Sequence, residues 1–307
     1  MLKKFQHIKA YIKDLTSRIV LPGFEGQNLF DVGKFFVQGL SSANVATRAA
    51  SVTYRFLMAA FPLIICIFSL IPFVPIDHFQ EDILTYIRSF FPSEVYAFFD
   101  DALVDLITYK RTFLLSIGFA VTIYLASSGI NALLEAFSSS YHLDVKRKFH
   151  KQILWSLLLL FAFMVFAILL TLISGFGQML IDYLSRKHFM DSTFSWTVMT
   201  ILKNVILFFL YYSVISMLYN IGHTEREKWK YFTAGTTMAT LLIILFQKGF
   251  SMYLTDIAKF DKLYGPLGAF LGFMLFFYYL FYLLIIGFEL NLSIHHVKKM
   301  KRNTEKL

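Results

Sequence analysis

The sequence predicts an all-α polytopic membrane protein, and three observations lead to that fold class. Of its 307 residues, 57% are hydrophobic and only 16% are charged, a balance that soluble domains of this size do not show. The apolar residues gather in six runs, each long enough to cross a hydrocarbon core of about 30 Å. Because these runs are unbroken rather than alternating, they indicate helices and not the strands of a membrane barrel.

The six predicted transmembrane helices occupy approximately residues 52–74, 113–137, 153–181, 198–221, 232–254 and 267–292. No short apolar core with a small-residue cleavage site, as in a signal peptide, precedes the first run. We therefore expect an amphipathic cytoplasmic segment over 1–45, a six-helix transmembrane domain over 46–295 and a basic cytoplasmic tail over 296–307.

Amphipathic stretches are expected outside these runs. Residues 1–20 place apolar side chains at three- and four-residue spacings between lysines, which predicts a basic helix lying on the inner leaflet. A second amphipathic helix is expected from about Leu29 to Leu40. The largest outer loop, 75–112, also shows helical apolar spacing, and we expect two short helices there.

The distribution of basic residues predicts the orientation. Segments on one side of the predicted spans carry 19 of the 29 Lys and Arg residues, whereas those on the other side carry 7. The positive-inside rule then puts both termini in the cytoplasm, as an even number of spans requires. These basic segments would meet anionic lipid headgroups at the cytoplasmic face, and no RNA-binding module accompanies the net charge of +9. We expect membrane lipids and no nucleic acid as partners.

Polar side chains inside the predicted spans are the candidate functional residues, because an ionised group in hydrocarbon is costly unless it is compensated. They fall into two sets by depth. The cytoplasmic set is Arg55, Asn131, Glu135, Glu289 and Asn291, and the outer set is Lys203, Lys248, Gln247, Gln178 and Asp182.

Two interpretations of these sets remain open. Two polar layers separated by apolar residues would suit a cavity closed at its middle, as alternating access requires. Alternatively, the lysines Lys203 and Lys248 extend outward to the headgroups, and the charges near the cytoplasm only hold helices together. We expect Arg55 to pair with Glu289, with Glu135 as the competing partner of Arg55, because the three lie at similar depth.

Small residues and a proline indicate how the helices pack. Pro62 removes one backbone hydrogen bond from the first predicted span, where a kink would serve packing or gating. Small residues recur at four-residue spacing from Ser128 in the second span, and at Gly268 and Gly272 in the sixth. This spacing lets helix backbones approach closely, so we interpret it as helix packing; it is also compatible with a homo-oligomer.

Catalytic chemistry, a metal site and a cofactor are not predicted. The single cysteine, Cys66, rules out an intramolecular disulfide and any CxxC pattern. The eight histidines form no HExxH pattern, and neither a nucleophile elbow nor a P-loop is present.

Several stretches resemble motifs of the YihY/BrkB family of membrane proteins. "TRAASVTYRFLMAAFPLII" looks like the first-span motif, and "ASSGINALLEAFSSSYH" resembles the second-span signature. "LYGPLGAFLGFMLFFYYLFYLLIIGFELN" is similar to the closing pattern, the most specific of the three. With "KWKYFTAGTTMATLLI" the resemblance spans roughly residues 40–295. Many relatives have Arg where this chain has Ser128, so no role of that Arg carries over.

The resemblance implies a six-helix protein of the bacterial inner membrane. Some members have carried a ribonuclease label, against which the absent nuclease motifs argue, and others a virulence-factor label. We expect a transporter or flippase-like protein for an anionic or amphiphilic solute, with lipid as one substrate class. The alternative is a structural or envelope-assembly factor without flux.

Overall fold

A computed structural model describes residues 16–42, 44–76, 78–90, 93–139, 149–186, 193–223, 229–253 and 266–304, and every regular element in these ranges is a helix. Within them, five helices are long and apolar enough to cross a membrane. They are α3 (Val45–Leu70, continued by the 3-10 turn Ile71–Phe73), α6 (Thr112–Ser138), α7 (Phe149–Arg186), α8 (Thr193–Gly222) and α11 (Pro266–Thr304). The predicted all-α, multi-pass class is confirmed.

The fifth predicted span forms the helix α9 (Ala234–Met252). Its 19 residues would extend about 28 Å, close to the thickness of the hydrocarbon core. Three threonines near its start, with Gln247 and Lys248 near its end, dilute its apolar sequence. It is therefore not among the five apolar helices found in the described ranges, and its crossing of the membrane stays a prediction.

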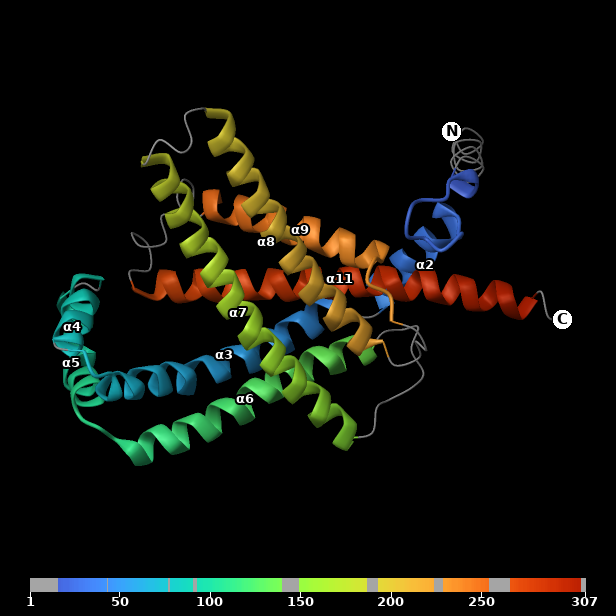
Figure 1. Cartoon of the computed structure of the whole chain (residues 1–307). Helices are drawn as coiled ribbons and strands as arrows, with labels where there is room; N and C mark the ends of the chain where they lie inside the picture. Colours follow the sequence, from blue (N-terminus) through green and yellow to red (C-terminus); the bar gives the residue numbers. More distant parts are fainter. Residues whose placement is uncertain are drawn as a thin grey trace, which may run out of the picture.

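The helices are arranged in two groups (Figure 1). Helices α3, α6, α9 and α11 run roughly along one direction, and α7 and α8 cross them obliquely. The described amino-terminal residues and the carboxyl end of α11 lie at the same end of the bundle, while α4 (Phe79–Phe90) and α5 (Ser93–Thr108) lie at the opposite end. Two helices thus lie between α3 and α6, where the sequence predicts a helical loop, and the outer location of this loop stays a prediction.

Small residues bring α3 and α6 together as an antiparallel pair. A Cβ added at Gly129 of α6 would lie 3.6 Å from the Cα of Phe56 in α3, an ordinary van der Waals contact. Ala132 and Ala136, one and two turns beyond Ser128, are buried in the main core. The small residues that follow Ser128 at this spacing thus lie against neighbouring helices, and α3 continues as one helix through Pro62.

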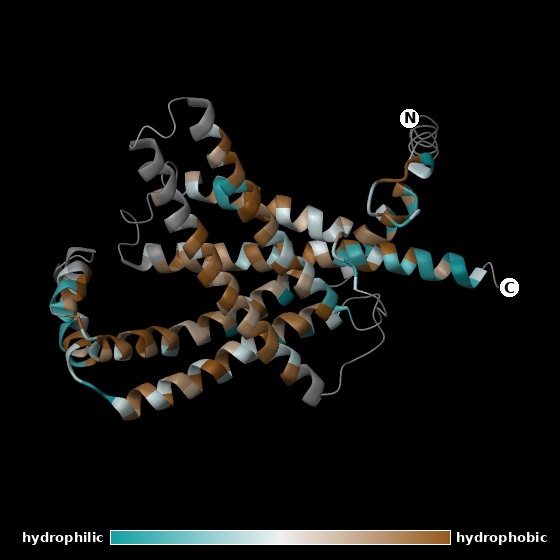
Figure 2. Ribbon diagram, viewed as in Figure 1, coloured by the Kyte–Doolittle hydropathy of each residue, from teal (hydrophilic) through white to brown (hydrophobic). Residues whose placement is uncertain are grey.

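Helix α11 extends far beyond the membrane-sized part of the bundle. Its 39 residues correspond to about 58 Å, nearly twice the hydrocarbon thickness. Figure 2 shows that its carboxyl end is hydrophilic, in contrast to its more hydrophobic middle part. Residues 296–304, which the sequence predicts as a basic tail, therefore continue α11 without a break.

The predicted second amphipathic helix is α2 (Leu29–Ser42), and it packs against the carboxyl end of α11. A buried cluster there contains Phe24, Val32, Leu290, Ile294 and Val297. The ring of Phe35 also lies 4.9 Å from that of His296. Of the basic helix predicted over 1–20, residues 1–15 lie outside the described ranges.

Glu25, in the loop before α2, joins three segments of the chain. Its carboxylate accepts hydrogen bonds from the Nζ of Lys230, between α8 and α9, and from the Nζ of Lys298 on α11, at 2.7 Å. Its backbone has φ 53°, a conformation that is uncommon for a non-glycine residue. Burial alone would raise the pKa of Glu25, but the hydrogen bonds and charges of the two lysines outweigh it and lower the pKa to about 2.

This pKa gives the Glu25 contact a defined pH dependence. A carboxylate whose pKa is depressed from 4.5 to about 2 stabilises the fold fully above pH 4.5, and the stabilisation is lost as the pH falls through about 2. We expect the melting temperature of the native chain to exceed that of Glu25→Gln by a constant margin between pH 7 and pH 5. Below pH 4.5 the margin should shrink and then vanish.

Thermal unfolding in detergent at fixed ionic strength measures this margin. Asp31→Asn is the control, because Asp31 lies 3.9 Å from Lys301 in an exposed pair whose contribution is expected to be small. A margin that persists undiminished at pH 2 would show that the carboxylate charge is not what Glu25 contributes.

Candidate functional site

The candidate site centres on Glu289, which is fully buried on α11. Its partner is Arg48 in the first turn of α3, whose Nη2 donates to Glu289 Oε1 at 2.5 Å. The Nη1 of Arg48 donates to the carbonyl of Ala136 near the end of α6. Only 10% of the Arg48 side chain is exposed. One buried guanidinium thus connects three membrane-spanning helices and compensates the charge of Glu289.

The predicted pairing of Glu289 with Arg55 is wrong. Arg55 instead lies 3.7 Å from Glu135, the competing partner, and both of these side chains are about half exposed. Arg48 precedes Arg55 by seven residues, which is two helical turns, so both lie on one face of α3. Glu289 lies beside Arg48 rather than beside Arg55.

Asn291 holds the start of α9. Its Oδ1 accepts a hydrogen bond from the backbone N–H of Gly235 at 2.8 Å, and its Nδ2 donates to Thr233 Oγ1 at 2.9 Å. Thr233 caps α9 by accepting from the backbone N–H of Thr236. The first N–H groups of a helix have no partner within the helix, so Asn291 and Thr233 satisfy two of them. The Glu-Leu-Asn sequence of α11 therefore binds α3 through Glu289 and α9 through Asn291.

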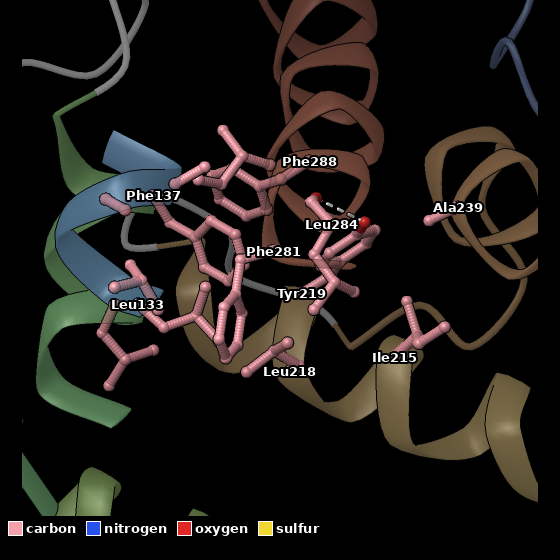
Figure 3. Close-up of a cluster of buried hydrophobic side chains, with 14 of the residues drawn as sticks. Leu133, Phe137, Ile215, Leu218, Tyr219, Ala239, Phe281, Leu284 and Phe288 are labelled. Atoms are coloured by element: carbon pink, nitrogen blue, oxygen red, sulfur yellow. Dashed lines mark hydrogen bonds between the residues drawn. The ribbon is translucent and has the colours of Figure 1, made fainter. Parts of the chain in front are cut away.

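Two glycines let α9 and α11 approach very closely. A Cβ added at Gly235 would lie 2.1 Å from the carbonyl oxygen of Gly287, and one added at Gly287 would lie 2.5 Å from the Tyr219 hydroxyl. That hydroxyl donates to the carbonyl of Leu284 at 2.7 Å, as Figure 3 shows. Gly235 and Gly287 thus lie where the backbones of α9 and α11 meet without room for a side chain. The glycines singled out from the sequence, Gly268 and Gly272, are buried as well.

An aromatic cluster flanks the ion pair. Phe137 of α6 stacks on Phe288 of α11 with ring centroids 4.2 Å apart, and Tyr219 of α8 meets Phe137 edge to face at 5.8 Å (Figure 3). Phe137 directly follows Ala136, and Phe288 directly precedes Glu289. These rings are buried and place apolar material beside the ion pair. An apolar environment strengthens the attraction between the charges of Arg48 and Glu289.

The other predicted residues are placed apart from this pair. Asn131 on α6 is partly buried, and its Oδ1 has no hydrogen-bond partner in the described part of the chain. Lys203 on α8 is partly exposed, and Lys248 on α9 is exposed, which fits the interpretation that Lys248 extends outward. The side chains of Gln178 and Asp182 lie outside the described set. Among the residues that are described, none form a group of three or more His, Cys, Asp or Glu that could hold a metal ion.

Sequence reasoning missed Arg48, Thr233 and Tyr219. Arg48 lies before the first predicted span, because the apolar run begins near residue 52, although the helix begins at Val45. Its seven-residue spacing from Arg55 is the signal that could have found it. A threonine before the small residues of "TAGTT" is likewise a recognisable N-cap, whereas nothing in the sequence distinguishes Tyr219 from its aromatic neighbours.

Comparisons with known proteins cover nearly all of the chain. A family model described as "Virulence factor BrkB" matches residues 36–306, which include Arg48, Glu289 and Asn291. The chain is 26% identical over 296 residues to the ribonuclease-like protein YfkH of Bacillus subtilis (strain 168), and the match covers 95% of this chain and 97% of that protein. No solved structure matches. The chain belongs to the virulence factor BrkB family.

Proposed function

We propose that this protein is a transporter or flippase-like protein that moves an anionic or amphiphilic solute across the cytoplasmic membrane. The Arg48–Glu289 pair is the observation that carries the proposal. Burying two charges inside membrane-spanning helices costs several kcal/mol per ion, and apolar residues of similar size would hold the helices at least as well. A pair retained at this cost is best explained by a second state in which the charges separate.

In the proposed mechanism the ion pair closes the cytoplasmic end of the interface between α3 and α11. An anionic headgroup competes with Glu289 for the guanidinium of Arg48, and the pair re-forms when the solute leaves. The contacts of Asn291 and the two close glycines, Gly235 and Gly287, hold α9 and α11 together as one unit. The α3–α6 pair is then the part that moves relative to α11.

The proposal includes six crossings, with α9 as the least apolar of them, and both termini in the cytoplasm. The excess of basic residues on the side of the termini supports this orientation. An alkaline phosphatase fused after Leu307 should be inactive, and a fluorescent protein fused there should fold and fluoresce. High phosphatase activity at that position would refute the six-span topology.

Two rival functions would require different roles of the same residues. A structural or assembly factor would use the Arg48–Glu289 pair only to hold helices together, without flux. The name of the Bacillus subtilis relative suggests ribonuclease activity. Against RNA cleavage at this site stands the burial of Arg48 and Glu289 among packed helices, where a large polyanion cannot reach them.

Reconstitution in liposomes tests the three hypotheses. Vesicles with the purified chain should expose fluorescently labelled anionic lipid from the inner leaflet to a membrane-impermeant quencher faster than empty vesicles do. The double variant Arg48→Gln/Glu289→Gln should slow this by at least about tenfold, the effect of about 1.4 kcal/mol in the rate-limiting step. Arg111→Gln is the control, because Arg111 pairs with Asp105 at the exposed opposite end of the bundle.

The outcomes separate the rivals. Equal rates with and without the protein, for anionic and zwitterionic lipids alike, would favour the structural factor. Magnesium-dependent RNA cleavage that co-elutes with the protein in size exclusion, and that is absent from a mock purification, would favour the ribonuclease.

A further inference from the structure

Arg55 differs from the other arginine of α3 in what its guanidinium contacts. Arg48 uses two of its donors, on Glu289 and on the Ala136 carbonyl, and is covered by α11 and α6. Arg55 has one partner in the described part of the chain, the carboxylate of Glu135 at 3.7 Å, which is too long for a hydrogen bond. Its side chain is 41% exposed and that of Glu135 is 52% exposed. An arginine with five donors is thus left open at the side of the bundle.

The depth of Arg55 places it within reach of lipid headgroups. The span 45–73 has 29 residues, about 43 Å, so several ångströms at each end lie beyond a hydrocarbon core of about 30 Å. Arg55 lies ten residues, about 15 Å, from Val45, which puts its Cα roughly 8 Å inside the hydrocarbon. Its side chain reaches back toward Glu135, three residues from the end of α6, and such a reach brings a guanidinium to the headgroup level.

The surface around Arg55 is suited to lipid rather than to water. The neighbouring Tyr54 is 62% exposed, and Met58, one turn further on, is 40% exposed. Tyrosine is enriched at the level of the headgroups, where its ring lies in the apolar region and its hydroxyl in the polar one. An open guanidinium next to an exposed tyrosine at this depth faces one abundant class of acceptor, the phosphate of a membrane lipid.

We propose that Arg55 binds the phosphate of an anionic lipid headgroup, which approaches sideways from the leaflet at the amino-terminal end of α3, and that Glu135 is its internal competitor. The planar guanidinium matches two phosphate oxygens at once, whereas it meets Glu135 through a single long contact. When the lipid leaves, Glu135 balances the charge of Arg55. As the place where a transported lipid first binds, this site rests on the proposed function, but lipid binding itself does not require transport.

Opposite effects of two substitutions distinguish this site from a structural ion pair. Binding of short-chain phosphatidylglycerol and phosphatidylcholine with identical acyl chains is measured by native mass spectrometry of the full chain in detergent. Arg55→Gln should weaken phosphatidylglycerol binding about fivefold, the worth of one basic residue near an anionic surface. Glu135→Gln should strengthen it by a similar factor, because the competitor is gone. Arg55→Lys should keep part of the affinity, and Arg111→Gln should leave it unchanged.

Other results would overturn the proposal. If Glu135→Gln weakens binding as Arg55→Gln does, the two residues form a structural pair. If inorganic phosphate or glycerol phosphate displaces phosphatidylglycerol at equal concentration, the site serves a soluble anion. If Arg55→Gln converts dimers to monomers and leaves lipid binding intact, Arg55 contacts a second copy of the chain. Should Arg55→Gln not fold, the comparison of Arg55→Lys with Glu135→Gln carries the same test.

The proposed lipid site and the proposed transport can each be refuted without refuting the other. Arg55-dependent lipid binding without flux in liposomes would leave the site and refute transport. Flux that is indifferent to Arg55, with no difference in phosphatidylglycerol binding between the native chain and Arg55→Gln, would refute the site and leave transport.

Discussion

Glu289→Gln is expected to destabilise the protein by about 3–5 kcal/mol, because it leaves the guanidinium of Arg48 buried without a counter-charge. Arg48→Gln should cost a similar amount by stranding the carboxylate and leaving the carbonyl of Ala136 without its donor. The double variant removes both charges, so we expect it to recover at least half of the loss. The melting temperature of the detergent-solubilised chain, followed by size exclusion after heating, measures all three.

The second ion pair of the same helix provides the control. Arg55 and Glu135 are about half exposed and 3.7 Å apart, so their coupling should stay below about 1 kcal/mol. If the effects of Arg48→Gln and Glu289→Gln simply add, to within the roughly 0.5 kcal/mol expected of independent sites, the two residues do not act as a pair.

Gly235→Ala is expected to cost about 3 kcal/mol or to prevent accumulation of the folded protein. The new methyl group would lie 2.1 Å from the carbonyl oxygen of Gly287, and this oxygen cannot move without shifting α11. Such a shift would also disturb the hydrogen bond from the Gly235 N–H to Asn291. Expression level and melting temperature of the purified variant measure the loss.

A matched control lies on the same helix. Gly249 also belongs to α9, but nothing lies within 4 Å of a Cβ added there. Gly249→Ala should therefore be neutral, or stabilise by up to about 1 kcal/mol, since alanine favours helix more than glycine does. Equal melting temperatures for the two variants would mean that α9 and α11 are not held together at Gly235.

The helices themselves could be predicted because their signal is local. A run of about 20 apolar residues satisfies its own backbone hydrogen bonds only as a helix in lipid, so the sequence near Val52 or Phe113 needs no distant partner to decide its fold. Helix ends are less well marked. The apolar run begins near residue 52, but α3 begins at Val45. The polar residues before the run are also helical, and one of them, Arg48, contacts Glu289 of α11.

The pairing of the site could not be predicted from the sequence. Counting residues from the ends of the predicted spans puts Glu289 and Arg55 at similar depth, and their position in the cytoplasmic half stays a prediction. The partner of Glu289, however, depends on how far α3 slides and rotates against α11. Arg48 and Arg55 share a face of α3, so only the packing of the helices distinguishes them. The same holds for Asn291, whose partner in α9 lies 56 residues away in the chain.

The continuity of α11 has a mechanical consequence. Beyond the predicted span 267–292, α11 continues without a break for 12 more residues, or about 18 Å, to Thr304. Tilting this part of the helix by about 10° would displace its far end by about 3 Å. Because α2 and the Glu25 loop contact this part of α11, a displacement of either would be carried to Glu289 along continuous helix. The cluster around α2 and the Arg48–Glu289 pair are thereby mechanically coupled through a single element.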